Sequence, residues 1–244
     1  MRYKCIVKYD GTNFHGFQTQ LNKRTVQAEI EQALFTMHKE KVNIFACSRT
    51  DSHVHALGQV IHFDSFLDIN EWNMKEAINS GLPSDIYISE VYKVDKSFHS
   101  QHNVVEKEYH YLIDLGEYNP LNYNYRLYPE RKLDVEAMED ASKVFLGKHD
   151  FKTFTKNHKS TSTIKEIYKI EFVRNDDLLC IKFIGNSFLY NMIRIMVAML
   201  LEVGYHHITK DDLKKALDAK DRKYAPKLAS GNGLYLVRVK YQDE

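Results

Sequence analysis

Arg194 places the strictest chemical demand on its surroundings, because it lies within an apolar segment. Residues 188–203 read FLYNMIRIMVAMLLEV and are apolar on almost every side of a helix. The segment is shorter than the roughly 18 residues that mark a membrane span, so we predict a buried core helix. A buried guanidinium is costly unless it is paired and hydrogen-bonded. Arg194 should therefore meet an acidic group, either in a structural ion pair or as the partner that keeps a catalytic carboxylate ionised.

The stretch CSRTDSHVH, residues 47–55, contains a single carboxylate, Asp51. It lies between two predicted strands, where a loop can present side chains from a rigid scaffold. Asp51 could cap a turn through its own backbone, or it could be a nucleophile or base. Asp51, His53 and His55 could also bind a metal, but their spacing matches no common metal motif, so we expect no metal.

A second candidate surface is the strand EKEYHY, in which Lys107, Tyr109 and Tyr111 share one face. Aromatic and basic side chains on a sheet face stack and hold unpaired RNA bases, although core tyrosines give the same pattern. Basic residues also gather in two later stretches. These are Lys148, Lys152, Lys156, Lys159 and Lys165, then Lys220, Arg222, Lys223 and Lys227. Both stretches could contact phosphates or could be solvated surface loops.

The composition limits the class of protein. The 244 residues include 34 Lys plus Arg and 33 Asp plus Glu, so a polyanion would have to meet locally concentrated positive charge. Cys5, Cys47 and Cys180 lie far apart, which excludes a disulfide framework and a zinc-ligand pair. The absence of a signal peptide pattern at the start of the sequence predicts a cytoplasmic protein.

The hydrophobic pattern predicts an α+β fold. The predicted strands are 2–9, 42–47, 58–63, 86–93, 107–115, 164–174, 178–184 and 234–241, and the predicted helices are 26–39, 71–80, 135–145, 188–203 and 211–217. Each half thus has roughly the ferredoxin-like order β-α-β-β-α-β. We expect domains at residues 1–100 and 101–244, joined in one continuous, mainly antiparallel sheet with helices on one side and the active-site cleft between the halves.

Six ordered motifs make the sequence similar to the tRNA pseudouridine synthase A family. They are YDGTNFHGFQTQ (9–20), SRTDSHVHALGQVIHF (48–63), KEYHY (107–111), GKHDFKTF (147–154), GNSFLYNMIRIMVAMLLEVG (185–204) and GLYLVRVKY (233–241). The resemblance implies isomerisation of uridine to pseudouridine at positions 38, 39 and 40 of the tRNA anticodon arm. It also implies a homodimer that uses no metal or organic cofactor.

The resemblance further assigns roles to residues. It implies that Asp51 is the catalytic carboxylate, that Tyr109 packs on the target base, and that Arg194 pairs with Asp51. The residues that we expect to bind the substrate are Gln18, Arg49, Lys107, Tyr111, Lys152, Lys156 and Lys159.

The sequence departs from the family pattern around these residues. In the catalytic motif Ser48, Ser52 and His53 replace Gly, Ala and Gly, and Ala198 replaces a Gly in the apolar helix. Near the C-terminus Leu228 and Ser230 stand where Thr and Pro are usual. A diverged second copy with altered site choice would fit these changes, and the alternative is a tRNA-binding module or folding helper without turnover.

Overall fold

The computed structural model describes residues 1–156 and 162–242, and it divides into two compact units. Unit 1 contains Met1–Val105 together with the chain from Tyr235 onward, and unit 2 contains Glu106–Leu234. Both units combine strands with helices, and the strand pairs described within each unit are antiparallel apart from one parallel pair. The predicted α+β class with mainly antiparallel pairing is therefore confirmed.

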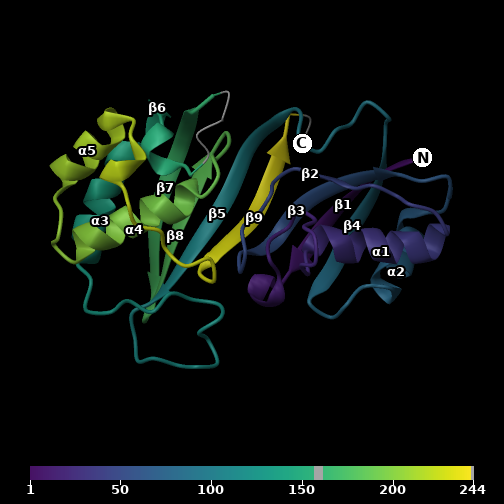
Figure 1. The fold of residues 1–244 in the computed structure, drawn as a ribbon, viewed down its shortest axis with the longest axis horizontal. Coiled ribbons are helices and arrows are strands. Elements are labelled where there is room, and N and C mark those ends of the chain that lie inside the picture. Colours follow the sequence, from purple (N-terminus) through teal and green to yellow (C-terminus); the bar gives the residue numbers. More distant parts are fainter. Residues whose placement is uncertain (157–161, 243–244) are drawn as a thin grey trace. The chain divides into compact units, whose positions relative to one another are not determined.

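In unit 1 the strands follow the order β4-β1-β3-β9, and β2 pairs with β3. Their bounds are β1 Arg2–Tyr9, β2 Phe45–Ala46, β3 His55–Asp64, β4 Ile86–Val94 and β9 Leu234–Tyr241. The helices α1 (Val26–His38) and α2 (Glu71–Ser80) pack against each other, and α2 packs on β4 (Figure 1). A short 3-10 turn, η1 (Gly11–Asn13), follows β1 directly.

Alternation of apolar residues explains why β1 forms a strand with one buried face. Tyr3, Cys5 and Val7 are fully buried, whereas the opposite row is mixed, with Lys4 8% exposed and Lys8 on the surface. Successive side chains of a strand point to opposite faces, so this pattern places one row in the core. The strand ends at Tyr9, immediately before the loop that reaches the candidate site.

In unit 2 the strands follow the order β5-β8-β7-β6. The strands are β5 Val104–Asp114, β6 Gly147–Asp150, β7 Ile164–Asn175 and β8 Leu178–Gly185, and the helices are α3 Val135–Ser142, α4 Met192–Gly204 and α5 Lys210–Ala219. Three 3-10 turns complete it: η2 Lys143–Phe145, η3 Lys152–Phe154 and η4 Arg222–Tyr224. The helices α3, α4 and α5 form one cluster (Figure 1), because α3 packs on both of the others.

The helix α4 is the core helix that the sequence predicts. All of its residues are buried except Arg194 and Glu202, which are partly exposed. In the part of the chain that the structure describes, no helix has both the length and the hydropathy to cross a membrane.

The C-terminal strand is placed differently from the expected division at residues 100 and 101. Tyr235 and Leu236 of β9 pair in parallel with His55 and Ala56 of β3, so this strand belongs to unit 1. The first unit has the predicted β-α-β-β-α-β order and gains a further strand from the end of the chain. In the second unit β6 is an additional short strand. The continuous sheet and the cleft between halves stay predictions.

Candidate active site

The loop that carries Asp51 is fixed by hydrogen bonds to the residue before it. The buried hydroxyl of Tyr9 lies 2.7 Å from Thr50 Oγ1, and the Phe17 backbone N–H donates to the Thr50 carbonyl at 3.0 Å. The Val54 N–H donates to the Asp51 carbonyl at 3.2 Å, which closes a turn. Asp51 itself is half-buried. Both ends of the turn are thus fixed, and the carboxylate keeps partial access to solvent.

Two glycines allow the segment after β1 to lie directly against this loop. A Cβ on Gly11 would come within 2.1 Å of the Val54 carbonyl oxygen. Gly16 has φ +92°, which side chains disfavour, and its Cβ would lie 2.9 Å from the Thr50 oxygen. Gly11 in the sequence YDG and Gly16 in HG therefore let the backbone lie close enough to hold the Asp51 loop.

His53 occupies the left-handed region, with φ 64°. This is one of the two positions where the family usually has Gly, so the expected strain is present at His53, whereas Ser48, at the other, has no positive φ. His tolerates this region better than most residues. Its ring Nδ1 lies 2.8 Å from the Thr12 carbonyl oxygen, a contact that a glycine could not make.

His55 is held in the core of unit 1. Its Nδ1 lies 3.0 Å from the Gly11 backbone nitrogen, and the ring stacks on Tyr235 at 4.6 Å. The Asp10 carboxylate lies 3.2 Å from the same nitrogen. Among the described residues, no His, Cys, Asp and Glu side chains group as a metal site would require.

Two predicted substrate-binding residues lie around the same loop. Arg49 is exposed and precedes the buried Thr50, and Gln18 is exposed and follows Phe17, whose N–H binds Thr50. Unit 1 therefore brings Gln18 and Arg49 close to Asp51. Tyr9, which anchors the loop, was not among the predicted site residues, although one of the six motifs begins with it.

In unit 2, Tyr109 lies on β5 with its ring edge-on to Phe188 at 5.3 Å, and it is 8% exposed. Tyr111 on the same face is fully buried, and its hydroxyl donates to the Ser230 carbonyl at 2.8 Å. Burial raises the pKa of Tyr111, and the positive charge of Arg194 acts in the opposite direction. The burial of Tyr111 favours a supporting role, so its contact with RNA stays a prediction. Lys107 is half-buried at the start of the same face.

Arg194 is held by the segment that precedes β9. Its Nε donates to the Ala229 carbonyl at 2.8 Å, and the Ala229 N–H donates to the Arg194 carbonyl at 3.1 Å. Since Ser230 accepts the Tyr111 hydroxyl, neighbouring backbone groups fix both side chains. We call residues 226–230 the strap. The acidic partner that the sequence predicts, Asp51, belongs to the other unit, and this pairing stays a prediction.

The two basic stretches of the sequence meet in unit 2. The Asp221 N–H donates to Thr153 Oγ1 at 3.1 Å, which joins η3 to η4. Lys152 and Lys156, both exposed, therefore lie near the η4 turn, although some 70 residues separate them in the sequence. Lys159 lies outside the described residues.

Comparison with known proteins identifies the family. The model of the family described as tRNA pseudouridine synthase matches residues 5–103 and 141–242. The chain is 44% identical to a tRNA pseudouridine synthase A of a Geobacillus strain and 46% identical to one of Listeria monocytogenes, each over 99% of both chains. This chain belongs to the tRNA pseudouridine synthase A family. Pseudouridine synthases are isomerases, so the predicted enzyme class is confirmed.

Proposed function

We propose that this protein isomerises uridine to pseudouridine at positions 38, 39 and 40 of the tRNA anticodon arm, as a homodimer in the cytoplasm. The observation that carries the proposal is the family match across both units, with full-length relatives of the same name. The reaction breaks the bond from C1′ to N1 of the base and forms a bond from C1′ to C5. The proton lost from C5 is balanced by one gained at N1, so no oxidant or reductant enters.

Asp51 is the proposed catalytic carboxylate. It could attack the anomeric carbon, add to C6 of the base, or remove the ribose 2′ proton, and each role requires the ionised form. The hydrogen bonds at Thr50 support the assignment, because they hold the backbone beside Asp51 in one conformation. Such positioning before the reaction removes part of the entropic barrier.

Tyr109 and Arg194 are proposed to complete the site. The target uridine must leave its stack, and a tyrosine ring can hold the detached base without fixing its in-plane orientation while it turns. Arg194 would favour the ionised form of Asp51. The edge-on contact of Tyr109 with Phe188 and the bond from Arg194 to Ala229 support these roles, since they limit the orientations of both side chains.

The remaining site residues are proposed to bind the RNA outside the reacting base. They are Gln18, Arg49, Lys107, Tyr111, Lys152, Lys156 and Lys159. The arginine and the lysines of this set neutralise phosphates and release counterions, which helps to offset the cost of opening a stem base pair. The exposure of Lys152, Lys156 and Arg49 supports this role.

The test uses unmodified tRNA transcripts that contain a single uridine at position 38, 39 or 40. Pseudouridine would be counted for the wild type, for Asp51→Asn, and for Asp68→Asn as a control. Asp68 is an exposed carboxylate that pairs with Lys93 at 2.7 Å in unit 1. We expect product from the wild type and the control, and none from Asp51→Asn.

Two results would contradict the proposal. Product from Asp51→Asn at the wild-type rate would remove Asp51 from the chemistry. Intact tRNA binding without product from the wild type would favour the binding-module alternative.

A further inference from the structure

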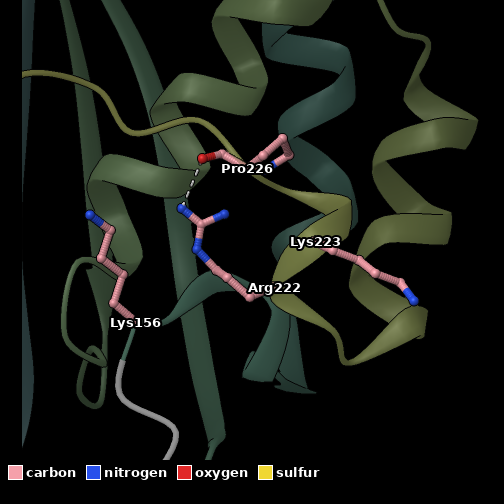
Figure 2. Close-up of a pocket in the computed structure, with 4 residues that line it drawn as sticks. All are labelled: Lys156, Arg222, Lys223 and Pro226. Atoms are coloured by element: carbon pink, nitrogen blue, oxygen red, sulfur yellow. Dashed lines mark hydrogen bonds between the residues drawn. The ribbon is translucent and has the colours of Figure 1, made fainter.

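A cationic pocket lies in unit 2, away from the strand that carries Tyr109. It has a volume of about 470 Å³ and is lined by Lys156, Arg222, Lys223 and Pro226 (Figure 2). This size falls within the range of small-ligand sites, but those are mostly apolar, whereas this lining is basic. The pocket is therefore suited to an anion.

One nitrogen of the Arg222 guanidinium is hydrogen-bonded, and the other two have no hydrogen-bond acceptor among the described residues. Its Nη2 donates to the carbonyls of Pro226 and Lys227 at 3.3 and 3.1 Å. Its Nε and Nη1 are shielded from solvent and have no hydrogen-bond partner among the described residues. Burial lowers the pKa of Arg222, the direction expected where no anion offsets the lost hydration. Buried N–H groups without an acceptor are costly, so a ligand that supplies an acceptor gains affinity.

The charges around the pocket single out Lys156 as the second cation. It is exposed, and none of the described carboxylates pairs with it. Lys223 differs, because its Nζ lies 3.2 Å from Asp221 and Figure 2 shows its side chain directed away from Arg222. Lys227 is likewise neutralised, with Glu202 at 2.7 Å. Arg222 and Lys156 thus carry the positive charge that is available to a ligand.

We infer that this pocket binds a phosphate of the RNA backbone, with one of the two unsatisfied nitrogens of Arg222 donating to a phosphate oxygen and Lys156 supplying a second positive charge. The inference rests on the proposed function, since it takes RNA as the substrate. A hydrogen bond from a guanidinium N–H to a phosphate oxygen is charge-assisted and therefore stronger than one between neutral groups. Both nitrogens are shielded from solvent in this structure, so the inference requires neighbouring side chains of the pocket to shift when the phosphate binds.

The experiment measures binding of unmodified tRNA over a series of salt concentrations. The variants are Lys156→Gln and, as a control with the same change in charge, Lys215→Gln on α5, whose side chain is 74% exposed. One phosphate contact contributes about 0.7–0.9 to the slope of log K against log salt, or about sixfold in affinity at 0.1 M salt. We expect Lys156→Gln to lose this amount and Lys215→Gln to keep the wild-type slope.

Arg222→Lys tests the guanidinium separately, because it keeps the charge and removes the Nε and Nη1 donors. It should bind tRNA more weakly with little change in slope. A wild-type slope for Lys156→Gln would overturn the inference. So would thermal stabilisation by inorganic phosphate that Lys156→Gln abolishes without any effect on the tRNA slope, because the pocket would then take free phosphate.

This binding assay does not depend on turnover. A wild type that binds tRNA with the predicted slope but forms no pseudouridine would sink the proposed function and leave the phosphate site intact. Pseudouridine formation together with a wild-type salt slope for Lys156→Gln would support the proposed function and overturn the phosphate site.

Discussion

Replacing Tyr9 by Phe should lower turnover through the backbone of the Asp51 loop, although Tyr9 is not itself proposed to react. The change removes one hydroxyl and keeps the ring, which packs against Phe17 at 6.2 Å. The lost group is the partner of Thr50 Oγ1 at 2.7 Å. Burial raises the pKa of Tyr9, so the hydroxyl is neutral at physiological pH and the change removes no charge.

The expected loss of stability follows from the burial of both hydroxyl groups. Tyr9 is 4% exposed and Thr50 is 8% exposed, so water cannot readily replace the lost hydroxyl. Leaving one buried polar group short of a partner costs about 1–3 kcal/mol. For a chain of this length, 1 kcal/mol corresponds to about 2–4 °C in Tm. A displacement of about 1 Å at the reacting group costs about a hundredfold in rate, so a partial displacement should lower kcat about tenfold.

Tyr3→Phe is the matched control, because it makes the same chemical change on the same strand. The Tyr3 hydroxyl bonds the backbone of Leu67 and Ile69, and neither residue belongs to the Asp51 loop. Both variants should lose thermal stability. Only Tyr9→Phe should lower kcat for pseudouridine formation, with the KM for tRNA nearly unchanged.

A thermal melt and a single-turnover assay on each variant decide the matter. Equal losses of kcat in Tyr3→Phe and Tyr9→Phe would show that turnover follows overall stability, and the positioning argument would fail. A double-mutant cycle with Thr50→Val should return a coupling of about 0.5–1.5 kcal/mol in stability. Zero coupling would mean that this hydrogen bond contributes nothing.

Three further predictions test other contacts. Tyr111→Phe should lower stability by about 1 kcal/mol and reduce kcat, because the Ser230 carbonyl in the strap loses its donor; an unchanged melt and rate would count against this. Gly11→Ala should lower Tm by several degrees, because its Cβ would lie 2.1 Å from the Val54 oxygen, and a wild-type melting curve would contradict the close approach. Burial lowers the pKa of His62 from 6.5 to about 4, so the folded protein binds this proton less readily than the unfolded chain and stability should fall as pH drops from about 6.5 to 4. His62→Gln should flatten this pH dependence in denaturant titrations, and an identical profile would refute it.

Local patterns in the sequence predict most of the elements but not all of their partners. The alternation in β1 sets its bounds closely, because the strand buries its own residues, whereas the apolar pattern placed the start of α4 at 188, four residues before Met192. The strand β6 was missed because GKHD has neither length nor an apolar row. The pairing of β9 with β3 was missed because parallel pairing of two distant strands leaves no local signal.

For the candidate site as well, the sequence predicts some residues but not the contacts between distant segments. Asp51 and Arg194 stand out in the sequence, one as the single carboxylate of a polar loop and the other as a charge in an apolar helix. The meeting of Thr153 with Asp221 could not be predicted, because it depends on a backbone N–H and on how two distant turns pack. Arg222 was noticed only as one member of a basic stretch, and only packing shows that two of its donors are unsatisfied.

The contacts that hold the site also explain why the departures from the family pattern leave it intact. Arg194 donates to the carbonyl of Ala229, and Tyr111 donates to that of Ser230. A proline at residue 230 would offer the same acceptor as the serine does, because proline loses the backbone N–H but keeps the carbonyl. In the loop, likewise, Thr50 is held partly through its backbone carbonyl, and His53 keeps the left-handed φ that a glycine would adopt. Substitutions at 53 and 230 therefore change the surface offered to RNA more than the positions of Asp51 and Arg194, so we expect them to alter the choice among tRNA positions before they abolish turnover.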